Sequence, residues 1–138
     1  MERDTALVVA AASQLAAGLV GEVVAVRRGR PSDPLLGHWN LPHDHLVRNA
    51  LVLGTGQSAP NVMMVTQAAA VVALARDGSP RARRTLGALG AVMVFGYLVE
   101  RESPLWPGRR DPLATTVFAA GFAGAVCMAW LGLRRRSA

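Results

Sequence analysis

Residues 5–26 of the chain read TALVVAAASQLAAGLVGEVVAV, an apolar run whose interior is interrupted only by Ser13, Gln14 and Glu22. A helix rises about 1.5 Å per residue, so a run of this length crosses a hydrocarbon core of about 30 Å. Arginines follow immediately at positions 27, 28 and 30. The stretch therefore predicts a transmembrane helix that ends at the membrane surface.

The rest of the 138-residue chain repeats this pattern. Hydrophobic residues make up 51% of it and charged residues 17%, against about a quarter charged in soluble domains. The predicted spans are residues 5–26, 58–75, 84–101 and 112–133, joined by a long polar first loop at 27–57. We therefore expect one all-α domain over residues 1–138, an integral membrane four-helix bundle that is multi-pass in the cell membrane.

The basic residues support the membrane interpretation. All fifteen are arginine, and they sit at the ends of the apolar runs, where they would anchor helices to lipid headgroups. Nucleic-acid binding is therefore not expected, despite the net charge of +6. The single cysteine, Cys127, excludes an internal disulfide and is expected to be a small buried residue.

The first loop concentrates the polar chemistry of the chain. Residues 37–49 read GHWNLPHDHLVRN and hold all three histidines. Three prolines and Gly37 break any early helix in the loop, and Asp44 is a plausible N-cap for a short interfacial helix at 44–53. His43 and His45, with Asp44, suit acid–base use, metal binding or a structural loop that packs on the bundle.

Glu22 is the first candidate acid, because it lies on an otherwise apolar helix. A carboxyl group at that depth must face a polar cavity or find a partner. Gln14, Gly18 and Glu22 are spaced i, i+4 and i+8, which predicts that they share a strip facing the bundle interior. The alternative is an interfacial ion pair of Glu22 with Arg27 or Arg28.

Glu100 is the second candidate acid, and Tyr97 lies three residues before it on a neighbouring patch of the same predicted span. The two form either a proton-donor pair or an interfacial ion pair beside an aromatic-belt residue. With four spans, these residues emerge on the same membrane face as Glu22, Asn61 and the histidine loop. We therefore predict a site at that face, roofed by the loop.

The candidate residues fall into two groups. The catalytic candidates are Glu22, Glu100, Asp44 and His43, and the substrate-binding candidates are His38, Trp39, Asn40, His45, Arg48, Asn49, Asn61, Gln67 and Tyr97. For Asn61 and Gln67, hydrogen bonding between helices is the alternative role. No metal ligand and no cofactor is expected.

In size, number of spans and position of acids, this layout resembles small integral-membrane terpene cyclases and, more distantly, four-helix membrane isomerases that move a sterol double bond. The features that carry the resemblance are Glu22, Glu100 and the cap His43-Asp44-His45. The resemblance implies a lipophilic isoprenoid-type substrate, cyclisation or isomerisation started by a proton, and no metal.

Two other function classes fit parts of the sequence. Gly21-Glu22-Val23 lies where small multidrug-resistance exporters, which work as dimers, carry a glutamate in their first span, but the long first loop departs from that family. A non-catalytic accessory subunit is the third class. We favour the enzyme, with a lipophilic small molecule and membrane lipids as partners and a homodimer as one possible assembly.

Overall fold

A computed structural model describes residues 2–27, 59–99 and 112–134 of the chain. Within these ranges the secondary structure is helical, with no strand. The helices are α1 (Glu2–Arg27), α3 (Asn61–Asp77), α4 (Pro80–Val99) and α5 (Pro112–Leu133). The predicted all-helical fold is confirmed.

Three of these helices are long and apolar enough to cross a membrane: α1 over Asp4–Val24, α4 over Pro80–Val99 and α5 over Pro112–Leu133. Helix α3 has 17 residues, so it is only about 25 Å long and is not one of the three. The polar loop at 27–57, apart from Arg27 at the end of α1, and its predicted helix at 44–53 lie outside the described residues. Among the described residues, three helices are thus long and apolar enough for membrane spans, where the sequence predicted four spans in the whole chain.

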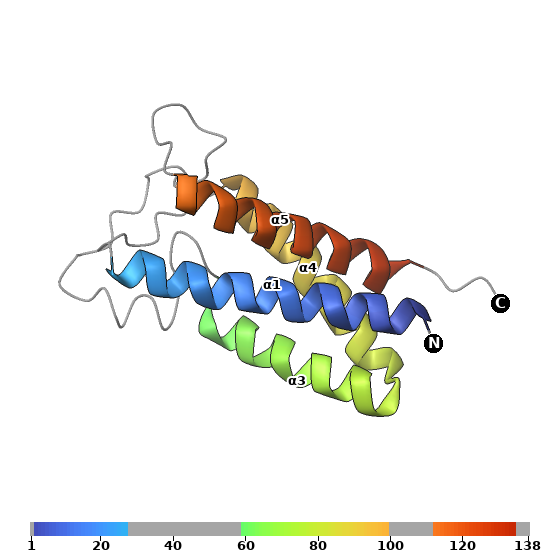
Figure 1. The fold of residues 1–138 in the computed structure, drawn as a ribbon. Helices are drawn as coiled ribbons and strands as arrows, with labels where there is room; N and C mark the ends of the chain where they lie inside the picture. Colours follow the sequence, from blue (N-terminus) through green and yellow to red (C-terminus); the bar gives the residue numbers. More distant parts are fainter. Residues whose placement is uncertain (1, 28–58, 100–111, 135–138) are drawn as a thin grey trace.

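The four helices lie side by side in alternating directions (Figure 1). Helix α5 packs against α1 and α4, while α3 packs against the same two helices from the other side. We call the end where α1 and α4 finish and α3 and α5 begin the loop end. The opposite end, with the start of α1, the end of α5 and the α3–α4 turn, is the arginine end, because Arg76, Arg81, Arg83, Arg84 and Arg134 lie there.

The turn between α3 and α4 is short, as the sequence around Gly78 and Pro80 predicts. Gly78 adopts a left-handed conformation (φ 60°), and its N–H donates to the carbonyl of Leu74 at 3.0 Å. The Ser79 hydroxyl accepts from the Ala82 N–H at 3.3 Å, and Pro80 opens the next helix. Because these caps set the boundary, α4 begins four residues before the predicted start at 84.

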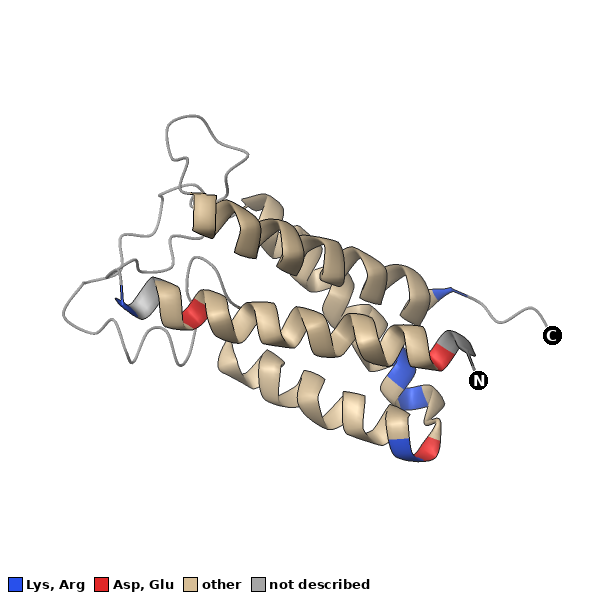
Figure 2. Ribbon diagram, in the orientation of Figure 1, with Lys and Arg blue, Asp and Glu red and all other residues tan. Residues whose placement is uncertain are grey.

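The distribution of polarity across the bundle suits lipid surroundings. Gln14 and Gln67 are buried inside, whereas Val62, Val65 and Trp130 point outward with 74%, 69% and 67% of their surface exposed. Charged residues of the described helices gather at the two ends of the bundle (Figure 2). The rest of the described interior is apolar, with Leu7, Leu86 and Met128 fully buried. The difference from a soluble bundle is therefore the outer surface, which is apolar between the two ends where a soluble bundle is polar.

Cys127 also lies on this outer surface, on α5. The expectation that it is buried was wrong, because an apolar run in a lipid-facing helix has no polar face to mark which side is exposed.

Helices α4 and α5 approach each other closely through glycines. A Cβ atom on Gly90 would lie 2.6 Å from the Ala129 nitrogen and 2.7 Å from the Ala125 oxygen. One on Gly87 would lie 2.8 Å from the carbonyl carbon of Gly132. The two backbones are therefore in direct contact, as small residues permit in membrane helix pairs.

Candidate functional site

Polar residues meet where α1 lies antiparallel to α3. Three successive levels pair Glu22 with Asn61, Gly18 with Met64, and Gln14 with Gln67. We call the residues Glu22, Asn61, Gln14 and Gln67, together with Tyr97 of α4, the polar seam. The predicted strip of Gln14, Gly18 and Glu22 does face the interior, where it meets α3, and Gln14 also lies against Gly124 of α5.

The outermost level lies near the loop end. Asn61 Nδ2 donates a hydrogen bond to Glu22 Oε1 at 3.0 Å, and both residues are partly buried. Glu22 is five residues before Arg27, the last residue of α1, which places it about 8 Å below that end of the helix. The sequence offered an arginine as the partner of this carboxyl group, and the structure places Asn61 against it.

The middle level is apolar. A Cβ atom on Gly18 would lie 3.5 Å from Met64 Sδ, an ordinary van der Waals contact, so the methionine fills the space beside the glycine. The thioether therefore separates the carboxyl group of Glu22 from the deeper polar groups.

The deepest level is a buried amide pair. Gln67 Nε2 donates to Gln14 Oε1 at 2.7 Å and to the Ala11 carbonyl at 2.8 Å, and it contacts Met128 Sδ at 3.6 Å. Gln67 is fully buried and Gln14 is 2% exposed. The two carbonyl oxygens fix the orientation of the Gln67 amide, because a flipped amide would place oxygen against oxygen. Its own Oε1 finds no hydrogen-bond partner among the described residues.

Tyr97 joins α4 to this network. Its side chain lies close to that of Gln14, and its ring packs edge-on against Phe118, with centroids 5.1 Å apart, and against Phe122 at 6.1 Å. Gly121 provides the space for the hydroxyl group, since a Cβ there would collide with it. Tyr97 is thus half-buried against α5, two residues before the end of α4, and both roles given for it from the sequence stay predictions.

Four of the predicted site residues lie along the polar seam, in two groups that Met64 separates. Glu22 contacts Asn61, and both Gln67 and Tyr97 contact Gln14. The other candidates lie outside the described residues: Glu100, His38, Trp39, Asn40, His43, Asp44, His45, Arg48 and Asn49. Sequence reasoning did not include Gln14 among the site residues, although its i, i+8 spacing from Glu22 was the signal that could have added it.

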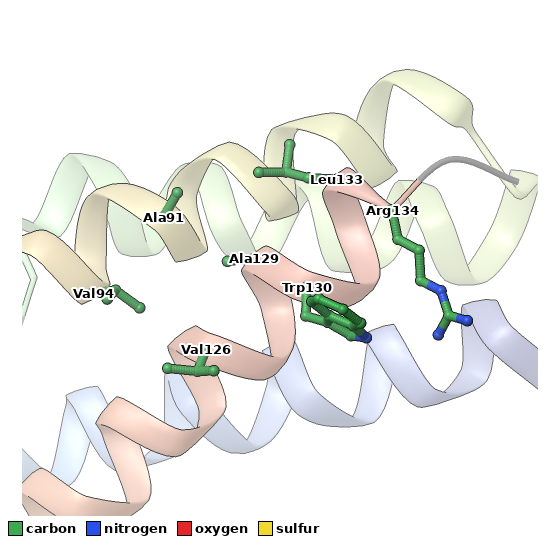
Figure 3. Close-up of a pocket in the computed structure, with 7 residues that line it drawn as sticks. All are labelled: Ala91, Val94, Val126, Ala129, Trp130, Leu133 and Arg134. Carbon is green, nitrogen blue, oxygen red and sulfur yellow. The ribbon is translucent and has the colours of Figure 1, made fainter.

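Two hollows lie on the described surface away from the polar seam. One is an apolar groove of about 620 Å³ between α4 and α5, lined by Ala91, Val94, Val126, Ala129, Trp130, Leu133 and Arg134 (Figure 3). The other, of about 590 Å³, lies at the arginine end and is lined by Gly78, Pro80, Arg83, Arg84, Ala88, Gly132, Leu133 and Arg134. Neither lining includes a residue of the polar seam.

The chemistry available at the polar seam is limited. Glu22 is the only acid in it and can give or accept a proton, while the amides and the phenol hydrogen-bond and orient. Within the described ranges, no three His, Cys, Asp or Glu side chains lie together as a metal site would require. The chain matches no protein-family model, no curated protein and no solved structure.

Proposed function

We propose that all four described helices cross the membrane, with α3 as the second span. Helix α3 packs against α1 and α4, which are both long and apolar enough to cross, so a bilayer around them surrounds α3 as well. Its outer face carries Val62 and Val65, which are strongly exposed, and its inner face hydrogen-bonds to α1. A length of about 25 Å is accommodated by slight thinning of the bilayer.

Cysteine labelling tests this topology, because the chain has one native cysteine. In intact membranes, Cys127 should resist a water-soluble maleimide and react only after unfolding in detergent. In a Cys127→Ala background, Val65→Cys on α3 should be protected in the same way, whereas Ser79→Cys in the α3–α4 turn should react once its side of the membrane is accessible. Reaction of Val65→Cys as fast as Ser79→Cys would exclude α3 as a span.

We further propose that the loop end is the site of proton chemistry on a lipophilic, isoprenoid-type substrate, with Glu22 as the acid. The observation that carries this proposal is the position of Glu22: one carboxyl group, held by Asn61 at 3.0 Å, at the outer end of an otherwise uncharged seam between two helices. A carboxylic acid in a low-dielectric site is suited to deliver a proton to an alkene, because water is excluded from the resulting cation.

The reaction needs no cofactor to balance. The Glu22 proton adds to one alkene carbon, and the adjacent carbon becomes a carbocation. In cyclisation, a second double bond attacks the cation and closes a ring. In isomerisation, the carbon skeleton stays unchanged. The Glu22 carboxylate then takes a proton from a carbon adjacent to the cation, which restores an alkene and the carboxylic acid together. The product is an isomer of the substrate, so no oxidant or reductant is consumed.

Packing below Glu22 favours this chemistry over transport. Gln14, Gln67 and Met128 are almost fully buried and in mutual contact, so in the described part of the bundle the seam is closed at that depth. A closed floor beneath an acid suits a reaction at one end of the bundle, whereas an exporter needs alternating access from both ends.

Deuterium incorporation tests the proposal whichever isomer is formed. Membranes containing the protein are incubated in D2O with farnesol or geranylgeraniol, and the extracted isoprenoids are analysed by gas chromatography and mass spectrometry. We expect isomers with one added carbon-bound deuterium, reduced about 100-fold or more in Glu22→Gln. Thr66→Val, on the exposed side of α3, is the matched control and should retain full turnover.

Two results would contradict the acid role of Glu22. One is undiminished incorporation in Glu22→Gln at equal amounts of folded protein. The other is equal loss in Thr66→Val, which would show that the assay reports general damage to α3 and not proton delivery.

A further inference from the structure

The two hollows on the described surface are parts of one larger surface at the arginine end. Leu133 and Arg134 line both of them. The groove continues from there along α5 to Val126, a distance of eight residues or about 12 Å, which is close to the depth of one leaflet. The apolar groove, which is about as long as one leaflet is deep, is thus continuous with the hollow that is lined by arginines.

The arginines of this surface have different roles. Arg83 donates to the carbonyls of Leu131 and Arg134, so its guanidinium is used to cap the end of α5. The Arg84 and Arg134 residues are exposed, and the Arg134 guanidinium lies 5.8 Å from the centre of the Trp130 ring. The residues lining the hollow at the arginine end include no acid, so the positive charge of its arginines is not balanced within the lining.

We propose that this surface binds an anionic phospholipid. Arg84 and Arg134 hold the headgroup phosphate, and one acyl chain lies in the groove over Val94 and Val126. Charge complementarity selects the headgroup, because arginines in a hollow between membrane helices favour anionic over zwitterionic lipid. Trp130 marks the boundary, with its ring in the groove and the Arg134 charge above it, as tryptophan does at membrane interfaces.

This inference rests on the membrane placement proposed above and not on the chemistry of Glu22, which lies at the opposite end of the bundle. A failure of the lipid site therefore leaves the deuterium assay unaffected. A failure of the membrane placement is seen first in the labelling of Cys127.

Fluorescence quenching tests the site, because Trp130 lies in its wall. The full chain with Trp39→Phe and Trp106→Phe keeps Trp130 as its single tryptophan. It is reconstituted into vesicles in which brominated phosphatidylglycerol or brominated phosphatidylcholine is a minor component. We expect the brominated anionic lipid to quench Trp130 preferentially, and Arg84→Gln or Arg134→Gln to lower that preference about fivefold each.

Arg81→Gln is the matched control. It removes one exposed arginine from the same end of α4 but from outside the lining of either hollow. Retained preference in Arg81→Gln, together with its loss in the other two variants, supports the site.

Three outcomes would overturn the lipid site. Equal loss of preference in Arg81→Gln would mean that diffuse surface charge attracts the lipid. Equal quenching by both brominated lipids would mean that the headgroup is not recognised. Weak quenching by either lipid would mean that something else, such as a second copy of the chain, covers the groove.

Discussion

Two helix pairs in the bundle, α4–α5 and α1–α3, are built in opposite ways. Helices α4 and α5 meet at glycines, because Gly87 and Gly90 have no side chain and let the two backbones touch. Helices α1 and α3 meet through polar side chains that hydrogen-bond across the gap, such as Gln67 with Gln14. In lipid both devices replace the hydrophobic effect, which does not distinguish a leucine in the bundle from a leucine in the bilayer.

The difference predicts how each pair responds to change. A backbone contact has no room for an added atom, so its failure is steric and large. A hydrogen-bonded pair loses a smaller free energy, because the separated partners also find other donors and acceptors. The α4–α5 pair is therefore suited to hold the bundle together. Polar side chains are costly to place in a membrane, which is the reason to look for function in the polar seam.

Gly90→Ala should have the largest effect of the changes that separate the two pairs. The added methyl group would lie 2.6–2.7 Å from Ala129 and Ala125 backbone atoms, so the helices must move apart. We expect a loss of about 3 kcal/mol in the free energy of unfolding, measured by circular dichroism in mixed micelles. Gly96→Ala is the control: a Cβ there meets nothing within 4 Å, and alanine favours the helix, so stability should hold or rise.

Equal stability of the Gly90→Ala and Gly96→Ala variants would break the comparison. It would mean that the α4–α5 contact yields to an added methyl group without cost.

Gln67→Leu should have an intermediate effect. Leucine is of similar size, so the loss comes from the hydrogen bonds to Gln14 and to the Ala11 carbonyl, and we expect about 1–2 kcal/mol. The double variant Gln14→Leu/Gln67→Leu should lose less than the sum of the single variants, because each single change leaves the other amide buried with fewer partners. Additive losses in the same unfolding assay would show that the two amides do not act as a pair.

Much of the helix framework follows from the sequence. Apolar runs bounded by arginines predicted the helices, and the sequence Asp77-Gly78-Ser79-Pro80 is typical of the turn found between α3 and α4. The i, i+4, i+8 spacing predicted that Gln14 and Glu22 share an inward face. These are local properties, fixed by chain periodicity and turn chemistry.

The partners across helices were not predictable in the same way. Nothing local in the sequence says that Asn61 meets Glu22, or that Tyr97 reaches Gln14 on another helix. Such pairs depend on helix register and rotation, and uniformly apolar helices carry little pattern to set either. The start of α4 was also predicted too late, because hydropathy marks where the apolar segment begins. The helix itself begins earlier, at the caps formed by Gly78 and Ser79.

Glu22→Gln should have the smallest effect on stability, and that is what makes it informative. Glutamine keeps an oxygen that accepts the Asn61 hydrogen bond, and the pair is only partly buried, so we expect a loss under about 0.5 kcal/mol. Glu22→Leu removes the acceptor and should cost about 1 kcal/mol in the same assay. If Glu22 is only structural, both variants should retain turnover at equal amounts of folded protein and differ only in stability. An acid would lose proton delivery in both, including the glutamine variant whose fold is intact. A large loss of stability in Glu22→Gln would instead assign the carboxyl group to holding α1 against α3, and the polar seam would then be a second structural interface.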